Sequence, residues 1–505
     1  MDTILLGVLC LCLSWGVVNI LFYGGRKRGN HTPEWSLPPG PRTLPIIGNL
    51  LQLGSLPHRS LTELSKVHGP IMSLKLGRVT TVVISSAHLA REVLQVKDVS
   101  FSDRIIPDTI TPFDHFKFGL AWMPVGPLWR NQRRICNAHL FGPKPLDSNQ
   151  QLRRQKIQEL VAHVGKCGET RSPVNFGAAA FQTVLSHLSN TILSMDLTGS
   201  RSESEEFKEK VWQIMVEAGK PNAVDYFPVL RPLDPQGARR RMMVYAKWLM
   251  DLFTGIIDRR LQARRAAGGS ESKNDVLDAL LNICEDEKEG LDLNQIKHIF
   301  LDLFVAGADT TSSTLEWAMA ELLHNPDKLL KAQAELHEEI GRGRPMEESD
   351  MTRLPYLHAI VKETLRLHPA VPLLLPRRAG VTAVVGGYTV PEGSQVLVNV
   401  WAIGRDPATW TRPEEFVPER FMGVQMDYKG QSFELLPFGS GRRICPGMPL
   451  ATRMLHLMLA SLINCFDWEL EGGAAPASLE MADVFGLTLK KAPPLRAVPS
   501  PRNSS

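Results

Sequence analysis

The chain lacks the cysteine patterns that mark small disulfide scaffolds. Its 505 residues contain only seven cysteines, at positions 10, 12, 136, 167, 284, 445 and 465, and no two of them form a C-x-x-C pair. Without an even framework of cysteines, a reducing compartment is the better expectation. Any metal chemistry must then use isolated ligands, so a single cysteine with special neighbours is the feature to look for.

An excess of one charge sign is absent as well. Lys and Arg number 57 against 53 Asp and Glu, and the net charge of +4 is too small to indicate nucleic acid as the main partner. Hydrophobic residues make up 43% and charged residues 22%, which excludes a highly charged disordered chain. No internal repeat is found, and no G-x-G-x-x-G motif opens a βαβ unit, so we expect no flavin or nicotinamide site in this chain.

The longest apolar run lies at the N-terminus. Residues 4–22 are interrupted only by Ser14, Asn19 and two glycines, and as a helix they would span about 28 Å, near the hydrocarbon thickness of a bilayer. A cleaved signal peptide would need positive charge before this run, but the only early charge is Asp2, and the cations follow at 26–28. We therefore predict an uncleaved single-pass membrane anchor at 1–25, with the C-terminal body in the cytosol.

The anchor is followed by a basic and proline-rich stretch, residues 26–45, which contains SLPPGP at 36–41. Prolines cannot continue a helix and favour a stiff, extended backbone. We expect this stretch to be a hinge that spaces the body from the membrane. The body is then expected at 46–498, with 499–505 as a flexible tail.

The coarse pattern of the body is helical with a smaller β portion. Alternating and β-branched residues at 72–76 and 80–84 predict a hairpin around Gly77. Helical periodicity dominates from there to about residue 370 and includes a long helix from Leu293 to His324. Short β-like runs return after residue 380. The fold class expected is mainly α, with a small β portion drawn from both ends of the chain.

The most informative segment is FGSGRRICPG at positions 438–447. Its glycines suit a backbone that approaches a neighbour closely or takes positive φ. A thiolate in a loop whose amides can donate hydrogen bonds to it is a good iron ligand. Arg443 could pair bidentately with a carboxylate such as a porphyrin propionate. The competing interpretation is a buried free cysteine in a turn.

This segment resembles the haem-binding loop of the cytochrome P-450 superfamily, F-x-x-G-x-R-x-C-x-G, at all five specified positions. The resemblance implies that Cys445 is the proximal thiolate ligand of a haem b iron. It also implies that Arg443 contacts a propionate and that Phe438 and Gly439 pack near the haem. The family's mainly helical, prism-shaped fold is then expected, with 46–498 as the haem-thiolate catalytic domain.

A second segment, AGADTT at 306–311, lies inside the expected long helix. A glycine in the middle of a helix costs about 1 kcal/mol relative to alanine, so something else must favour it. One interpretation is structural: Thr310 back-bonds to the carbonyl of Ala306 and bends the helix. The segment is also similar to the family's oxygen-activation motif. That resemblance implies that Asp309 and Thr310 occupy the proton-relay positions of a monooxygenase.

Two further patterns are common by chance, and only their order in the chain makes them informative. Glu363 and Arg366 share a helix face at i,i+3 and precede PERF at 418–421. This order resembles the family's Glu-Arg-Arg core, which implies that Arg420 completes a buried network important for folding and haem retention.

The other weak pattern is W-x-x-x-R at Trp129 and Arg133. It matches the family's propionate-contacting helix, and Arg377 lies where another propionate ligand is expected. Arg130, Arg134 and Arg442 are candidates for a basic face that docks an acidic electron-transfer partner, although such a charge run is more often only a solvated surface.

Segments 220–237 and 306–317 look like those of the plant microsomal group, most of all the geraniol 8-hydroxylase and ferruginol synthase group of terpenoid oxidases. The same resemblance implies a largely apolar distal pocket that includes part of the loop 113–123 and the residues Val305, Ala306, Val371, Leu375 and Phe485. A terpenoid substrate fits such a pocket, and a flavonoid or other phenylpropanoid is the alternative. A non-catalytic haem electron carrier or sensor is the alternative of another class.

The resemblance also implies the partners. Electrons would come from NADPH through a separate NADPH-cytochrome P-450 reductase, with cytochrome b5 as a second candidate donor. The expected location is the endoplasmic reticulum membrane, where the protein contacts lipid through its anchor and keeps its catalytic domain on the cytosolic face.

Overall fold

The computed structural model describes residues 36–198, 201–266, 273, 275–285 and 290–502. The anchor predicted at 1–25 and the first part of the predicted hinge lie outside the described residues. Among the described residues, no helix has both the length and the apolar character needed to cross a membrane.

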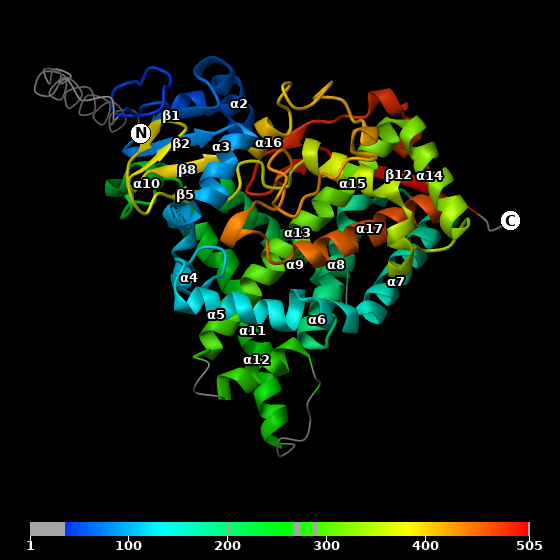
Figure 1. Ribbon diagram of the computed structural model, residues 1–505. Helices are drawn as coiled ribbons and strands as arrows, with labels where there is room; N and C mark the ends of the chain where they lie inside the picture. Colours follow the sequence, from blue (N-terminus) through cyan, green and yellow to red (C-terminus); the bar gives the residue numbers. More distant parts are fainter. Residues whose placement is uncertain (1–35, 199–200, 267–272, 274, 286–289, 503–505) are drawn as a thin grey trace, which may run out of the picture.

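Helices make up most of the molecule, which has a roughly triangular outline in Figure 1. Their bounds are α2 Pro57–His68, α3 Ala87–Arg91, α4 His115–Phe118, α5 Pro127–Cys136, α6 Pro143–Ser148, α7 Gln150–Glu169, α8 Phe176–Leu193, α9 Arg201–Gly219, α10 Ala223–Tyr226, α11 Ala238–Ala266, α12 Val276–Glu285, α13 Leu293–His324, α14 Pro326–Ile340, α15 Pro355–Leu367, α16 Val400–Ile403 and α17 Met448–Cys465.

The strands are short and form four small sheets in the described part of the chain, ordered β1-β2-β8-β5-β3, β4-β12-β9, β6-β7 and β10-β11. Their bounds are β1 Ile71–Leu76, β2 Val79–Ile84, β3 Asp103–Arg104, β4 Val174–Asn175, β5 Arg377–Arg378, β6 Ala383–Val385, β7 Tyr388–Val390, β8 Gln395–Val398, β9 Phe466–Leu470, β10 Asp483–Val484, β11 Lys490–Lys491 and β12 Arg496–Pro501.

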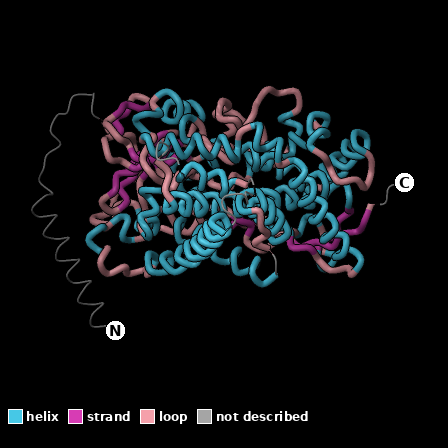
Figure 2. Tube along the Cα trace, turned by 90° about the horizontal axis from the view of Figure 1, so that it is seen from below, coloured by secondary structure: helices cyan, strands magenta, loops and turns pink. Residues whose placement is uncertain are grey.

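The largest sheet joins distant parts of the sequence. Strands β1 and β2 form the predicted hairpin, with Leu76 opposite Val79. Strand β2 then pairs in parallel with β8, where Thr81 lies opposite Gln395. Figure 1 shows these strands together at one corner of the molecule, and Figure 2 shows that helices fill most of the rest. A mainly α fold with a β portion from both ends is therefore confirmed.

The described part of the predicted hinge is folded onto this sheet. The Ser73 amide donates to the carbonyl of Pro39 at 2.8 Å, and the Ser73 hydroxyl donates to Pro38 at 2.7 Å. A Cβ at Gly40 would lie 1.9 Å from the Ser73 carbonyl oxygen, so only glycine fits there. Prolines lack an N–H but keep their carbonyls as acceptors, and this segment uses the carbonyls of Pro38 and Pro39 to pack against β1.

The C-terminal boundary also differs from the prediction. Strand β12 continues to Pro501, which lies opposite Phe466 of β9. Residues 499–501, which we expected in a flexible tail, therefore belong to an antiparallel ladder. Two prolines in this strand concealed it in the sequence, since proline weakens a strand signal.

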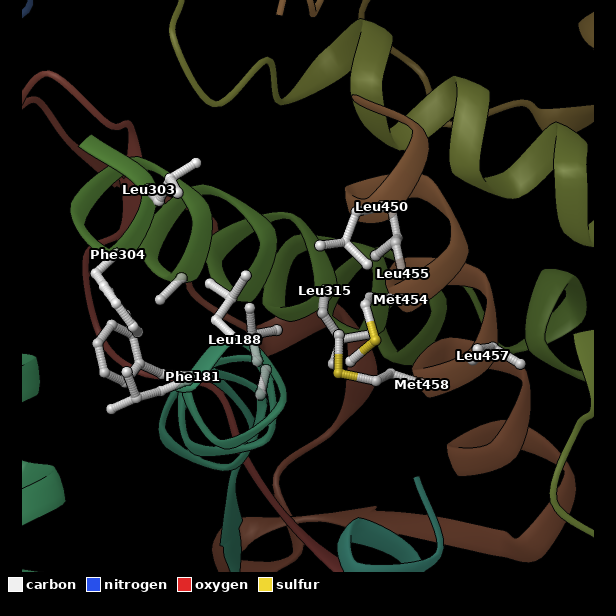
Figure 3. Packing of buried hydrophobic residues seen from close by; sticks show 14 of the residues in the cluster. Phe181, Leu188, Leu303, Phe304, Leu315, Leu450, Met454, Leu455, Leu457 and Met458 are labelled. Atoms are coloured by element: carbon white, nitrogen blue, oxygen red, sulfur yellow. The ribbon is translucent and has the colours of Figure 1, made fainter. Parts of the chain in front are cut away.

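Helix α13 has the predicted bounds and runs through the core. A capping box begins it, in which the Asp292 carboxylate accepts from the Gln295 amide at 2.7 Å. Figure 3 shows α8 against one side of α13, with Leu188 directed at it, and α17 against another, with Met454 and Met458 directed at Leu315. A Cβ at position 307 would lie 3.1 Å from the Leu188 side chain, so Gly307 permits the close packing of α8.

A buried ionic network fixes α15 to the loop that follows α16. The Arg366 guanidinium donates to both Glu363 carboxylate oxygens, at 2.7 and 2.8 Å. Arg420 donates to Glu363 at 3.0 Å, and the Val417 amide donates to the same oxygen at 2.8 Å. The Glu363 and Arg366 side chains are 0% exposed. Arg366 also reaches the backbone carbonyl of Gly404 at 2.5 Å.

We expect Glu363→Gln to lower the free energy of unfolding by about 3–5 kcal/mol, because it leaves two buried cations without their shared carboxylate. Urea unfolding followed by far-UV circular dichroism measures this. Glu339→Gln is the matched control, since Glu339 pairs with Arg353 where both side chains are at least a third exposed, and such a pair contributes less than about 1 kcal/mol. Equal losses in the two variants would contradict the role of the network.

Candidate functional site

One cavity of about 360 Å³ collects most of the predicted site residues. It lies beside α13, and its wall includes α5, α8 and the loop that precedes α17. The predicted residues that line it are Trp129, Arg133, Val305, Ala306, Thr310, Val371, Leu375, Arg377, Phe438, Gly439, Arg443 and Cys445. The structure thus gathers residues that are more than 300 positions apart in the chain.

Two predicted site residues do not line this cavity. Asp309 is 1% exposed and lies on another side of α13. Phe485 lines a neighbouring cavity of about 130 Å³ and stacks on His58 with ring centroids 5.5 Å apart. Leu487, two residues later in the loop between β10 and β11, borders both cavities. The chain reverses direction in this loop, so Leu487 reaches the larger cavity and Phe485, the residue expected there, does not.

The cysteine loop takes the strained backbone that its glycines predicted. Gly439 and Gly441 both have φ of +69°, and a Cβ at Gly441 would lie 2.0 Å from the carbonyl oxygen of Leu94. The Cys445 amide donates to the carbonyl of Phe438 at 3.0 Å and closes the loop. These constraints hold Cys445 at the cavity wall. Of the cysteines in the described residues, it alone lines the cavity.

The surroundings of the Cys445 sulfur act on its pKa in two directions. Burial raises the pKa of the thiol above its ordinary value, while hydrogen bonds from the Gly447 and Met448 amides and the charge of Arg133 lower it. The amides and the guanidinium favour the thiolate form, as a soft metal ligand requires. A cation bound to the sulfur would add to them and offset the effect of burial.

Four arginines surround the cavity near this loop, namely Arg104, Arg133, Arg377 and Arg443. Arg443 donates to the carbonyls of Ser102, Leu120 and Met123 at 2.8, 3.3 and 2.5 Å. Burial lowers the pKa of Arg443 and of Arg377 to about 10, and the Arg104 pKa falls well below its ordinary value because of burial and then the charges of Arg377 and Arg443.

These four guanidinium groups have no carboxylate within ion-pair distance among the described residues, and the Arg377 Nε atom is buried without a hydrogen-bond partner there. Buried cations without an anion are costly. The cluster is therefore suited to a ligand that carries negative charge. Trp129 supports it, because the Arg443 guanidinium lies 5.0 Å from its ring centroid and the indole donates to Leu120 at 3.1 Å.

Sequence reasoning missed Arg104, Asp302 and Leu487, which also line the cavity, whereas His115 lies in the loop 113–123 that was expected to contribute to it. Arg104 lies in the two-residue strand β3, and it donates to the carbonyl of Leu375 at 2.8 Å. No spacing pattern marks such a residue, since its place depends on the pairing of β3 with β5. Asp302 carried a usable signal, because it lies two helical turns before Thr310 on the same face of α13.

Thr310 and Asp309 face different surroundings. The Thr310 hydroxyl donates to the carbonyl of Ala306 at 2.7 Å, the back-bond that the structural interpretation expected. Thr310 and Ala306 also line the cavity, so the Thr310 hydroxyl oxygen is available there as an acceptor. The Asp309 carboxylate pairs with Lys490 of β11 at 2.5 Å, and the Lys490 ammonium lies 3.8 Å from the ring centroid of Trp212.

Residues 38–495 match the family described as "Cytochrome P450". Geraniol 8-hydroxylase of Swertia mussotii is 55% identical over 92% of this chain and 94% of its own length. Drimenol monooxygenase of Persicaria hydropiper is 50% identical over 98% of this chain and 96% of its own length.

Among solved structures, a zebra fish cytochrome P450 with progesterone superposes with a TM-score of 0.74. It is 28% identical, and the match covers 88% of this chain and 99% of the other. Family, relatives and fold agree with the cavity that Cys445 and the four arginines line, and the chain belongs to the cytochrome P450 family.

Proposed function

We propose that this protein hydroxylates an apolar terpenoid of plant specialised metabolism. Membership of the family and the named activities of its relatives make it a cytochrome P-450 monooxygenase. The observation that carries the substrate class is the cavity itself, in which the Cys445 loop and Thr310 share a chamber lined mainly by aliphatic and aromatic side chains.

The residues present fit the family's haem with its thiolate-bound iron. Cys445 would bind the iron, since its sulfur already receives amide hydrogen bonds. Arg104, Arg133, Arg377 and Arg443 would hold the two propionates, which supply the negative charge that these buried cations lack. Phe438 and Gly439 line the same wall. When bound, the haem supplies oxygen activation with electrons from a reductase.

The protein's own contribution to the reaction is the supply of protons and the exclusion of water. The Thr310 hydroxyl can accept a hydrogen bond from the cavity side while it donates to Ala306. Asp309 directly precedes Thr310 on α13 and pairs with Lys490, whose side chain is 18% exposed. We infer that Lys490 and Asp309 form a path for protons from solvent to Thr310. This path replaces the proton that Thr310 passes on.

The two relatives described above support a terpenoid substrate. Geraniol and drimenol, the compounds in their names, are both terpenoid alcohols. Val305, Val371 and Leu375 offer the apolar surface that such a skeleton needs. The balanced reaction takes one dioxygen, NADPH and a proton, inserts one oxygen atom into a C–H bond, and releases water and NADP⁺.

Partners and location follow from the family and the sequence. The protein takes electrons from a redox-partner reductase. We propose that Arg130, Arg134 and Arg442 lie in its docking face, since all three are exposed and flank the helix and loop that carry Arg133 and Cys445. Cytochrome b5 would use the same face. We further propose that the N-terminal run anchors the protein in the lipid of the endoplasmic reticulum membrane, with this domain in the cytosol.

The substrate class is tested on membranes that contain this protein, a plant reductase and NADPH, supplied with mono-, sesqui- and diterpenes and with flavonoids. We expect a product heavier by one oxygen from a terpenoid, detected by mass spectrometry and absent without NADPH. A flavonoid product instead would promote the alternative substrate class. No product at all, together with an intact ferrous-CO spectrum, would refute the assignment to these two classes.

Cys445→Ser is expected to abolish the thiolate-type absorption of the ferrous-CO form, because a hydroxyl cannot replace the sulfur as a strong donor to iron. Cys167→Ser, at a partly exposed cysteine outside the cavity, is the control and should leave the absorption unchanged. A normal spectrum from Cys445→Ser would rule out this residue as the ligand.

Thr310→Ala is expected to uncouple electron use from hydroxylation. Product per NADPH should fall about tenfold or more, with hydrogen peroxide released in its place, because a proton is no longer delivered at the right position. Thr314→Ala is the matched control, since Thr314 makes the same back-bond one turn later, to Thr310 at 2.9 Å, and also lines the cavity. Equal coupling in parent and Thr310→Ala would exclude the proton-relay role.

A further inference from the structure

A polar cluster interrupts the apolar wall at the start of α13. His115 of α4 and Asp302 of α13 both line the cavity, and the His115 Nε2 atom lies 3.0 Å from an Asp302 oxygen. The other Asp302 oxygen accepts from the Ala121 amide at 3.1 Å. Their side chains are 11% and 14% exposed. A carboxylate is thus built into the wall of a chamber that otherwise favours hydrocarbon.

The cluster is supported from behind by a second histidine. His298, one turn before Asp302 on α13, is 0% exposed, and its Nδ1 atom lies 2.9 Å from Nδ1 of His115. Burial lowers the pKa of His298 to about 4, so this ring is neutral near pH 7. His298 can then donate to His115, which in turn donates from Nε2 to Asp302. This order orients the His115 ring toward Asp302.

The carboxylate still has acceptor capacity. Each carboxylate oxygen can accept two hydrogen bonds, and each Asp302 oxygen has one donor in the structure. Burial of a charged group is costly unless its hydrogen bonds are completed. A hydroxyl group that enters the cavity would supply a further donor at the point where the wall offers an acceptor.

The position of Asp302 sets a distance. Asp302, Ala306 and Thr310 succeed one another at intervals of four residues and all line the cavity. Eight residues of helix separate the first from the last, which corresponds to about 12 Å along the axis. That distance is close to the length of an extended monoterpene alcohol. A substrate held by its hydroxyl at Asp302 would therefore bring its opposite end to Thr310.

We propose that Asp302, oriented by His115, is the anchor of the substrate site: it accepts a hydrogen bond from the hydroxyl group of a terpenoid alcohol and directs oxidation to the end of the skeleton remote from that hydroxyl. This inference rests on the proposed function and deepens it. The preferred substrate is then a terpenoid that already carries a hydroxyl. The reaction that supplies this substrate must therefore be one that forms an alcohol.

The first test uses the unmodified full-length protein and two ligands that share a carbon skeleton, geraniol and geranyl methyl ether. Only geraniol has an O–H donor. Spectral titration of the haem absorption band gives a dissociation constant for each. We expect geraniol to bind about tenfold more tightly, since a hydrogen bond to a charged group discriminates at that level. Equal constants for the two ligands would overturn the anchor without the need for any variant.

The second test compares two variants. Asp302→Asn should weaken the binding of geraniol but not of the ether, and should spread oxidation over several carbons in place of the remote end. His298→Gln removes the support of His115 without reaching the cavity, so it should lower the preference for geraniol by less than Asp302→Asn does. If both variants weaken the two ligands equally, the cluster is only a structural link and the inference is wrong.

Failure of the inference and failure of the proposed function give different results. If the protein oxidises geraniol and its ether with the same affinity and at the same mixture of positions, it is a terpenoid hydroxylase without this anchor. If it oxidises no terpenoid while the ferrous-CO spectrum is intact, the proposed function itself is overturned, and the anchor with it.

Discussion

The constraint on which the site depends is positive charge that is buried with no carboxylate at ion-pair distance in the described part of the chain. Arg104, Arg377 and Arg443 belong to different segments, yet all reach one cavity wall, where backbone carbonyls satisfy part of their hydrogen bonds. Carbonyl dipoles do not replace a carboxylate, so the wall is completed only by an anionic ligand. The small β3-β5-β8 ladder, which looks incidental, places two of these arginines side by side, since Arg104 lies opposite Arg377. Cofactor binding and folding of this corner are therefore expected to be coupled.

The sequence predicted the parts of the site whose chemistry is local. The residues around Cys445 indicated a thiolate loop, because positive φ depends on the glycines at those positions. The composition of 306–311 indicated a helix with a functional segment, because low helix propensity is also a property of the residues themselves. It could not predict Arg104, which reaches the cavity only because β3 pairs with a strand more than 270 residues away. For the same reason Phe485 does not line the larger cavity as predicted, since the conformation of the hairpin loop determines which of its residues points inward. Long-range pairing, not local pattern, sets these positions.

Gly307 illustrates how one residue can satisfy two demands. The resemblance of 306–311 to the family's oxygen-activation motif gives this glycine one reason to stand inside a helix. The contact with Leu188 gives the same glycine a packing reason, because α8 approaches α13 closely at this point. Close approach of α8 narrows the chamber on one side, while Ala306 keeps it open on the next face. The shape of the cavity and the rigidity of α13 thus come from the same short segment.

Helix α13 unites the site because it carries residues that line the cavity and also an aspartate that pairs outside it. Residues four apart lie on one face, so Asp302, Ala306 and Thr310 all reach the cavity. Asp309 is rotated by about 100° from Thr310, which removes its carboxylate from the substrate and turns it toward Lys490. The proposed proton supply and the proposed substrate anchor thus use two different aspartates of α13, seven residues apart in sequence. One pairs with Lys490 and the other lines the cavity.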